Sequence, residues 1–423
     1  MNNHGAQLNE FCGTLRRVTA DSLLKGCIRN QNFKYLLDLA TNMGIKNLTK
    51  LIHQEAPEAI KEEKGPQAYT GTKVAIDASM ALYQFMVAVR SASGSGVQMN
   101  LTNEAGEITS HIQGFFSRTI RLLEKGIKPV WVFDGKAPDL KGGELKKRKA
   151  MKEKAAAELK KAQEDGDVEK QDQMSKRTVR VTKEHNEDIK KLLRLMGCPV
   201  IEAPMEAEAQ CAALAKQGLV FAAASEDMDT LTFGTTKLLR KFTAPESKKI
   251  PVMEINLEKV LEGFKMDMNQ FIDLCILCGC DYMDNIRGVG SKTAFKLIKE
   301  HGNMENVLKY LRGKGEAEKI PAEYPFEEAR KLFKNHPCLP KDEVKLKFGK
   351  VDKDGLRKFL CDDKGFNVER VNNQIKRLEK VSGKATQRRM DSFFKVLPSS
   401  GSNKKRIMAG KGKGKKSAKK FRR

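Results

Sequence analysis

The chain of 423 residues lacks any apolar run long enough to cross a bilayer. Its first 42 residues also lack the basic start and continuous apolar core of a secretory signal. We therefore expect neither a membrane-spanning nor a secreted protein.

Cysteine is scarce, with 9 scattered residues in an odd number. This usage predicts a reducing compartment and no disulfide scaffold. Cys275, Cys278 and Cys280 stand close together, but they lie in an apolar segment without a second Cys or His pair. We interpret them as core residues and not as a zinc site, because structural zinc needs a set of four well-spaced ligands.

Acidic residues are outnumbered, with 54 Asp and Glu against 79 Lys and Arg, so the formal net charge is +25. A hydrophobic content of 40% excludes a wholly disordered basic protein. A folded body with such a positive excess points to a polyanionic partner. Nucleic acid is the first interpretation, and an anionic membrane surface is the second.

Seven acids nevertheless stand beside apolar segments, where charged side chains are uncommon. They are Asp77, Asp134, Glu206, Glu208, Asp227, Asp229 and Asp281. A buried strand that stops at a carboxylate places it at the strand's end, where a parallel sheet opens into a crevice. Several carboxylates in one crevice repel one another unless cations lie between them. The pattern therefore predicts a divalent-metal site built from oxygen ligands.

These acids differ in how clearly they point to a metal. Asp77 and Asp134 each end an unambiguous apolar run. Glu206 and Glu208 would point apart on an ideal helix, so they share one site only at an irregular first turn or across two metals. The alternative for them is a pair of acids that stabilise a helix N-terminus. The pair Asp227 and Asp229 is typical of many metal enzymes, phosphatases included.

The spacing of apolar residues predicts an α/β fold. Two buried strands, 74–77 and 130–134, flank a helix with one apolar face over 110–123. A strand, helix and strand in this order form a βαβ unit, so we expect a central, mostly parallel sheet with right-handed crossovers. The pattern returns with a helix over 186–196, a strand at 199–201, a helix over 205–216 that starts near Pro204, and a strand over 220–224. Beyond residue 255 the chain reads as helices.

Residues 141–183 are rich in Lys, Glu, Ala and Gln, which predicts a charged helical segment. A solvated helical hairpin is the plain interpretation. The segment starts seven residues after Asp134, however, so Lys141 and Arg148 emerge beside the proposed metal site. There they could hold a phosphate and offset the charge of a transition state.

A Gly-x-Gly turn, Gly288 to Gly290, lies between two helical stretches. Glycine lets the backbone approach a ligand, and the next helix begins with free N–H groups. Such a hairpin can hold a DNA phosphate without reading sequence, and its carbonyl groups can hold a monovalent cation. An ordinary helix–helix turn is the alternative.

The tail, 385–423, is polar and basic, and we expect it to be disordered. Within it, one helical turn would place Met390, Phe393 and Phe394 on a single apolar face, as in a peptide that docks into a hydrophobic groove. A chance apolar trio is the alternative. The Lys/Arg run after Asn403 fits a nuclear-localisation signal or a DNA-anchoring tail equally well.

Six motifs, in order, resemble the flap endonucleases, the structure-specific 5′ nucleases of the XPG/Rad2 family. They are Met43-Gly44-Ile45, Val74-Ala75-Ile76-Asp77-Ala78-Ser79, Val132-Phe133-Asp134-Gly135-Lys136, Glu206-Ala207-Glu208-Ala209, Glu226-Asp227-Met228-Asp229 and Gly288-Val289-Gly290. The likeness runs from residue 43 to the tail. It implies a PIN-like nuclease core with a helical arch and a helix-hairpin-helix DNA-binding region.

The resemblance also implies residue roles. All seven acids match metal ligands, and the residues that match catalytic positions are Lys141, Arg148, Asp134 and Asp229. Positions that match DNA contacts are Tyr83, Arg90, Arg118, Glu206, Gly279, Asp281, Gly288, Gly290 and Lys292. The segment Gln387, Met390, Phe393 and Phe394 is similar to the box that binds the sliding clamp PCNA, a trimer.

The function that the resemblance implies is removal of 5′ flaps, with 5′-3′ exonuclease activity, in DNA replication and repair. We expect two Mg²⁺ (or Mn²⁺) ions, roughly 4 Å apart, on the scissile phosphate, and a K⁺ ion at the Gly288–Gly290 turn. The expected partners are branched 5′-flap DNA and PCNA, with no membrane. The expected location is the nucleus, with the mitochondrion as the second location.

The chain departs from the family at its start, because 42 residues precede Met43, where family members begin. Either they are a real extension or the start was placed too early. Cys280 and Met390 also replace more usual residues. If residues 1–42 block the site, the chain is instead a catalytically impaired DNA-binding and clamp-binding paralogue. A metal-dependent phosphatase is a further alternative, although it would not need the Gly-x-Gly hairpin.

These observations divide the chain into regions. We expect an N-terminal extension (1–42), two nuclease regions (43–150 and 184–275), a helical arch (141–183), a helical DNA-binding region (276–380) and the tail (385–423).

Overall fold

The strands that position the candidate site belong to one seven-stranded sheet with the order β1-β7-β6-β5-β2-β3-β4. Their bounds are β1 (Ile60–Glu63), β2 (Lys73–Asp77), β3 (Lys128–Phe133), β4 (Val200–Glu202), β5 (Ala222–Ala224), β6 (Lys237–Arg240) and β7 (Val252–Asn256). β2 lies between β3 and β5 and is parallel to both, and β4 and β6 continue the parallel set. Only β7 runs antiparallel to its neighbours, β6 and β1. The predicted α/β fold with a mostly parallel sheet is confirmed.

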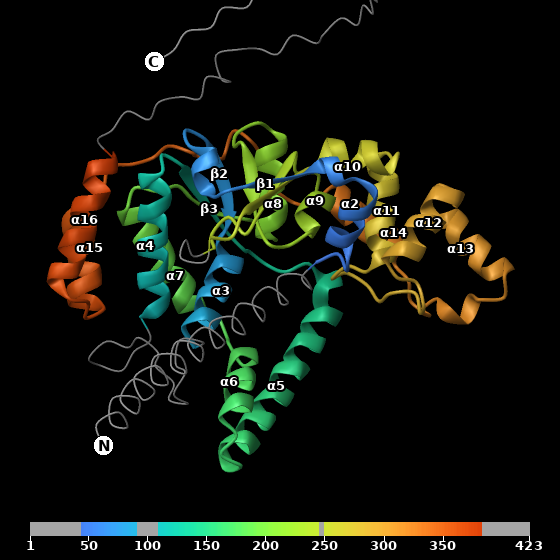
Figure 1. Cartoon of the computed structure of the whole chain (residues 1–423), viewed down its shortest axis with the longest axis horizontal. Coiled ribbons are helices and arrows are strands. Elements are labelled where there is room, and N and C mark those ends of the chain that lie inside the picture. The colour runs from blue at the N-terminus through green and yellow to red at the C-terminus, as the bar shows by residue number, and fades with distance from the viewer. Residues whose placement is uncertain (1–43, 91–108, 245–248, 383–423) are drawn as a thin grey trace, which may run out of the picture. The chain divides into compact units, whose positions relative to one another are not determined.

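This computed structural model describes residues 44–90, 109–244 and 249–382 (Figure 1). The extension 1–42 and the clamp-like motif Gln387–Phe394 lie outside the described residues, so what we predicted of them stays a prediction. Within the described part, no helix has the length and apolar character needed to span a membrane.

Helices cover both faces of the sheet, and successive side chains of each strand point to opposite faces. Val74 and Ile76 of β2 pack with the helices α3 (Ala78–Arg90), α4 (Ser110–Glu124), α7 (Lys183–Leu195), α15 (Lys353–Arg357) and α16 (Val368–Ser382). Ala75, between them, faces the opposite side and packs against α8 (Ala207–Lys216). Both faces are apolar, as expected for parallel strands buried on both sides.

A second core is built mainly from the helices that follow β7, where the chain is helical as predicted, together with two earlier helices. It contains α2 (Leu48–Glu55), α9 (Asp229–Thr232), α10 (Leu257–Phe264), α11 (Met268–Cys278), α12 (Ser291–His301), α13 (Met304–Gly313) and α14 (Phe326–Lys334). Phe264 packs against Phe271 and Phe295, with ring centroids 6.2 and 5.1 Å apart. Cys275 and Cys278 are buried in α11. The interpretation of these cysteines as core residues agrees with this placement.

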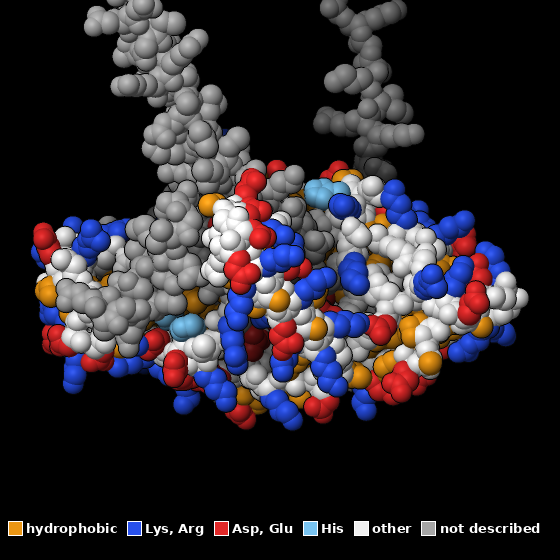
Figure 2. Space-filling model, turned by 90° about the horizontal axis from the view of Figure 1, so that it is seen from below, with side chains coloured by type: hydrophobic (Ala, Val, Ile, Leu, Met, Phe, Trp, Pro, Cys, Tyr) orange, Lys and Arg blue, Asp and Glu red, His pale blue; other side chains and the backbone are white. Residues whose placement is uncertain are grey.

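The charged segment folds as the predicted helical hairpin, which we call the arch: α5 (Gly142–Glu164) and α6 (Val168–Arg177). It projects from the body below α3 and the helical region (Figure 1). In α5 only Ala155 and Ala162 are buried, and its other residues are mostly charged, with Leu145 and Met151 exposed among them. Figure 2 views this side of the molecule and shows Lys and Arg side chains spread around the arch, with acids among them. The sequence did not predict β1, β6 or β7.

Candidate metal centre

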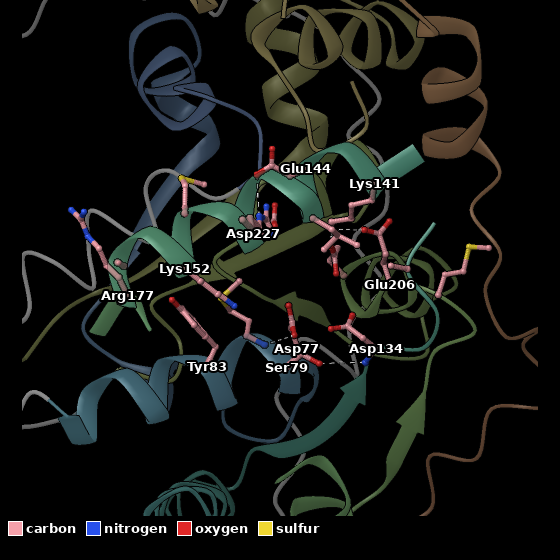
Figure 3. Close-up of a pocket in the computed structure, with 18 of the residues that line it drawn as sticks. Asp77, Ser79, Tyr83, Asp134, Lys141, Glu144, Lys152, Arg177, Glu206 and Asp227 are labelled. Carbon is pink, nitrogen blue, oxygen red and sulfur yellow. Dashed lines mark hydrogen bonds and ion pairs between the residues drawn. The ribbon is translucent and has the colours of Figure 1, made fainter. Parts of the chain in front are cut away.

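The carboxyl ends of three neighbouring parallel strands bring acids together at one edge of the sheet. Asp77 is the last residue of β2, Asp134 directly follows β3, and Asp227 stands three residues after β5. The amide of Met80 donates to Asp77 Oδ1 at 2.9 Å, and Ser225 Oγ donates to Asp77 Oδ2 at 3.1 Å. Figure 3 shows these acids on the wall of the same hollow.

The start of α8 supplies two more acids to this edge. Glu206 is the N-cap residue with an extended backbone (φ −91°, ψ 133°), and Glu208 lies in the first turn. The amide of Ala207 donates to Asp134 Oδ1 at 2.7 Å, which ties the helix start to the end of β3. Glu206 therefore stands just before the helix and Glu208 within it, and both reach the same cavity. The helix begins at Ala207, two residues after the predicted start at Met205, because the chain bends at residues 204–205 between β4 and the helix.

Five of the seven acids line one cavity of about 1090 Å³, whose opposite wall is the arch. The five are Asp77, Asp134, Glu206, Glu208 and Asp227. Asp229 and Asp281 are not on the lining but lie close behind it. Asp229 is 1% exposed, its amide donates to Asp227 Oδ1 at 2.9 Å, and its own Oδ1 has no hydrogen-bond partner. A buried carboxylate oxygen without a partner is costly, so this oxygen favours a cation or a proton beside it.

Lys141 and Arg148 reach this cluster from the base of the arch, as predicted. Lys141 Nζ lies 2.6 Å from Glu206 Oε1, 3.2 Å from Asp281 Oδ2 and 3.7 Å from Glu208 Oε1. Arg148 donates to Asp281 Oδ2 at 2.8 Å and to Glu144 Oε1 at 3.0 Å. Both side chains therefore bind acids of this cluster directly. The side chain of Lys141 is only 12% exposed.

Burial and mutual repulsion change the acid–base behaviour of these carboxyls. Burial, and then the charge of Asp134, raises the pKa of Asp77 to about 7. Burial also raises the pKa of Glu208, Asp227 and Asp229 above their usual range, with neighbouring carboxylates adding to the effect. Burial acts to lower the pKa of Lys141, but the charges of Glu208, Glu206 and Asp281 outweigh it and raise that pKa. The cluster thus holds more negative charge than one ammonium can balance.

The donor set fits hard divalent cations, because every candidate ligand is a carboxylate oxygen. Within residues 44–90, 109–244 and 249–382, no three His, Cys, Asp or Glu side chains are arranged around one ion position. The cation among Glu206, Glu208 and Asp281 is instead the Lys141 ammonium. The raised pKa values and the unpartnered Asp229 oxygen both indicate that the acids favour additional cations.

Gly44, the first described residue, lies directly against this cluster. Its φ is +67°, and a Cβ there would come within 1.9 Å of Asp227 Oδ1 and 2.7 Å of Asp229 Oδ1. Only glycine combines this left-handed backbone with so close an approach. The chain that precedes Gly44 therefore joins the described structure beside the acids.

The residues predicted to contact DNA are distributed over three places. Tyr83 lines the cavity, and Figure 3 shows its ring beside Lys152 of the arch. Gly288, Gly290 and Lys292 are exposed at the turn before α12, where the predicted Gly-x-Gly hairpin is present. The guanidinium of Arg118 is stacked 3.8 Å over the Phe85 ring, and its Nη1 is buried without a hydrogen-bond partner among the described residues.

Two further predicted DNA contacts, Gly279 and Arg90, lie at helix ends. Gly279 ends α11 and is buried, and its carbonyl accepts the amide of Lys46 at 3.3 Å. It is therefore enclosed by the body in this conformation. Arg90 is the last residue of α3, and its side chain lies outside the described set.

Several residues of the centre were missed from the sequence. Ser79 Oγ accepts the amide of Asp134 at 3.3 Å, Ser225 bridges Asp77 and Asp227, and Tyr282 Oη donates to Glu206 Oε2. Ser79 and Ser225 each stand two residues from an acid, and this spacing is a signal that could have found them. Tyr282 follows Asp281, but its bond to Glu206 spans 76 residues, and no local pattern reveals it.

The sequence matches two family descriptions. The XPG N-terminal domain matches residues 43–155, and the XPG I-region matches residues 197–281. Flap endonuclease 1-A of Sorghum bicolor is 53% identical over 364 residues, which cover 86% of this chain and 94% of the relative. Flap endonuclease 1 of Nematostella vectensis is 51% identical over 377 residues, which cover 89% and 98%.

The chain belongs to the flap endonuclease family. Solved structures agree with this assignment: flap endonuclease-1 from Methanococcus jannaschii is 36% identical with a TM-score of 0.57, and the match covers 76% of this chain and 96% of that one. The catalytic core of Rad2 in complex with DNA substrate is 25% identical with a TM-score of 0.60, over 79% and 100%. As a flap endonuclease family member the chain is a nuclease, and the acidic cavity is where metal-dependent chemistry of this family fits the structure.

Proposed function

We propose that this protein is a structure-specific endonuclease that removes 5′ flaps from DNA, and acts as a 5′-3′ exonuclease, during replication and repair. The observation that carries the proposal is the cavity in which buried acids from three strand ends and α8 face Lys141 and Arg148 of the arch. A flap endonuclease relative over most of the chain supports the same reaction.

The candidate ligands are the seven acids, and bound Mg²⁺ or Mn²⁺ would supply activation of the attacking water and stabilisation of the leaving oxygen. The Asp134 carboxylate is held by the amide of Ala207 and the Asp227 carboxylate by the amide of Asp229, so both are already oriented when cations bind. Lys141 and Arg148 neutralise charge on the scissile phosphate, and the products are a 5′-phosphate and a 3′-hydroxyl. Tyr83 lies on the same wall, where it can stack on a base.

The proposal extends to parts of the chain outside the centre. Exposed Gly288, Gly290 and Lys292 hold the phosphate backbone of duplex DNA, with a K⁺ ion at the turn. The motif Gln387–Phe394 docks on the trimeric clamp PCNA, and the basic tail directs the protein to the nucleus. Contacts of this kind are independent of sequence, so we expect binding to weaken steeply as salt rises.

The direct test is cleavage of a labelled 5′-flap duplex with Mg²⁺ by the wild-type chain and by Asp134→Ala and Asp229→Ala. Both variants should lose flap cleavage by a factor on the order of 10³ or more, because each removes a ligand oxygen and leaves its partners unbalanced. Unchanged cleavage by either would remove the two-metal assignment. Hydrolysis of a small phosphomonoester without flap cleavage would favour the phosphatase alternative.

A parallel assay decides what residues 1–42 do. The full chain is compared with a chain that starts at Met43, because Gly44 lies against Asp227 and Asp229. Equal rates would show that the extension leaves the site open. Activity only in the shorter chain would support the alternative of a catalytically impaired DNA-binding and clamp-binding protein.

A further inference from the structure

The segment that follows α14 runs alongside the start of α8 and contacts it twice. The Glu206 amide donates to His336 Nε2 at 3.4 Å, and the Leu339 amide donates to Gln210 Oε1 at 2.7 Å. Glu206 and Gln210 are one helical turn apart, so both contacts lie on the same side of α8. These bonds join parts of the chain that are 130 and 129 residues apart.

The orientation of the His336 ring is fixed by packing. Its side chain is 3% exposed and meets Phe233 edge-on, with ring centroids 5.0 Å apart at 67°. Phe233 in turn packs on Phe333, at 5.2 Å, and Phe333 packs on Tyr282, at 4.9 Å. The hydroxyl of Tyr282 donates to Glu206 Oε2. A ring held in this way keeps Nε2 directed at the helix start.

The hydrogen bond of His336 is to the backbone of Glu206 and not to its carboxylate. Nε2 lies 3.7 Å from Glu206 Oε2, which is too long for a hydrogen bond. An imidazole nitrogen that accepts an amide N–H must carry a lone pair, so Nε2 is unprotonated. The ring therefore acts by holding the backbone of Glu206 in place. The Glu206 side chain does not cap its own helix, and the next amide, of Ala207, is bound by Asp134. His336 thus holds the one residue whose extended backbone lets Glu206 and Glu208 share a site.

We propose that His336 is a positioning residue for the metal centre: it fixes the first turn of α8 so that Glu206 and Glu208 are pre-set as ligands. The inference rests on the proposed metal-dependent function of this site. The bond between Gln210 and Leu339 anchors the same segment from the other end. Partners behind the ligands commonly set metal affinity in this way.

The test measures Mg²⁺ binding to the DNA-free protein by titration calorimetry, and then the Mg²⁺ dependence of flap cleavage and the KM for flap DNA at saturating Mg²⁺. His336→Ala should weaken Mg²⁺ binding about tenfold, the low end for residues that support metal ligands, and leave the KM for DNA unchanged. His336→Gln keeps an acceptor at the end of its side chain and should recover most of the affinity. Asn335→Ala, an exposed neighbour in the same segment, is the matched control and should change nothing.

A second variant tests the route through the segment. Gln210→Ala should also weaken Mg²⁺ binding, and the double variant with His336→Ala should lose less than the product of the two single effects, because both break one connection. Wild-type Mg²⁺ affinity in His336→Ala, or no recovery in His336→Gln, would overturn the inference. If His336→Ala fails to fold, Gln210→Ala and His336→Gln still decide it. If the wild-type protein does not cleave flap DNA, the proposed function is contradicted. The Mg²⁺ titration still tests the role of His336 in that case.

Discussion

The acidic cavity and the arch both contain charged side chains, but most acids of the cavity are buried and most charged side chains of the arch are exposed to solvent. In the cavity Asp77 is 5% and Asp227 is 6% exposed, and their pKa values are raised. On the arch, Lys149 and Glu153 form an ion pair at 3.9 Å with 80% and 68% of their side chains exposed. Solvated pairs of this kind contribute little to stability, whereas buried like charges cost much.

The two regions meet at the base of the arch, and this is where charge has a functional consequence. Lys141 is 12% exposed among three carboxylates, and Arg148 and Lys147 bind Asp281 and Asp284 from the same helix. The arch is therefore attached through cations to the acids that it covers. Position along the arch, and not residue type, therefore separates the charged residues that contact the site from those that only face solvent.

Replacing Lys141 should have the largest effect on this difference. Lys141→Ala removes the ammonium among Glu206, Glu208 and Asp281, so turnover at saturating flap DNA should fall by about 10² to 10³. Flap binding, measured by fluorescence anisotropy, should change far less. Lys149→Ala removes the same charge from an exposed position of α5 and is the control, with near wild-type turnover. An equal loss of turnover and binding in Lys141→Ala would make it a binding residue only.

The pH dependence of Mg²⁺ stabilisation is the next largest effect. The folded-state pKa of Asp77 is about 7, above its unfolded value of 3.8, and Glu208, Asp227 and Asp229 are shifted in the same direction. Their contribution to stability is therefore full below about pH 4 and is lost as pH rises through the folded values. Lys141 stays protonated in this range, because its pKa is raised. Without metal, the cavity destabilises the protein more at pH 8 than at pH 5.5.

Bound Mg²⁺ replaces protons as the charge that balances the carboxylates. The rise in the Tm of the protein on addition of Mg²⁺ should therefore be larger at pH 8 than at pH 5.5, by on the order of a few degrees. Thermal unfolding with and without Mg²⁺ at the two pH values measures this. Asp77→Asn should reduce the pH dependence, because one of the titrating groups is gone. An equal or larger increase in Tm at pH 5.5 would contradict the prediction.

The smallest expected effect concerns the arch away from its base. Asp167 caps α6 by accepting the amide of Lys170 at 3.0 Å. Asp167→Ala should destabilise the hairpin locally by about 1 kcal/mol. Faster hydrogen exchange of α6 amides, with little change in global Tm, would show it. Asp167→Asn keeps an acceptor and should restore protection; if it exchanges as fast as the alanine variant, the cap is not the cause.

Much of the site could be predicted because it follows from local patterns. Apolar runs that stop at Asp77 and Asp134 predicted strand ends, and parallel pairing then required these ends to meet. The arch was predicted from its composition. The place of Lys141 beside the site was predicted because it follows Asp134 closely in the sequence. The position of Glu206 and Glu208 could not be decided, because an ideal helix and an irregular first turn have the same sequence. The structure places Glu206 at the N-cap of α8, where His336 and Asp134 accept the amides of Glu206 and Ala207.

The order of acids along the chain determined which strands end in carboxylates, and hence where cations must bind. Only the tertiary structure decided that Ser225 joins Asp77 to Asp227, that Gly44 lies against the acids, and that His336, 130 residues later, holds Glu206. The physical reason is the range of the interactions. Burial and strand pairing repeat with a short period that a sequence displays, whereas a single hydrogen bond between distant segments leaves no periodic trace.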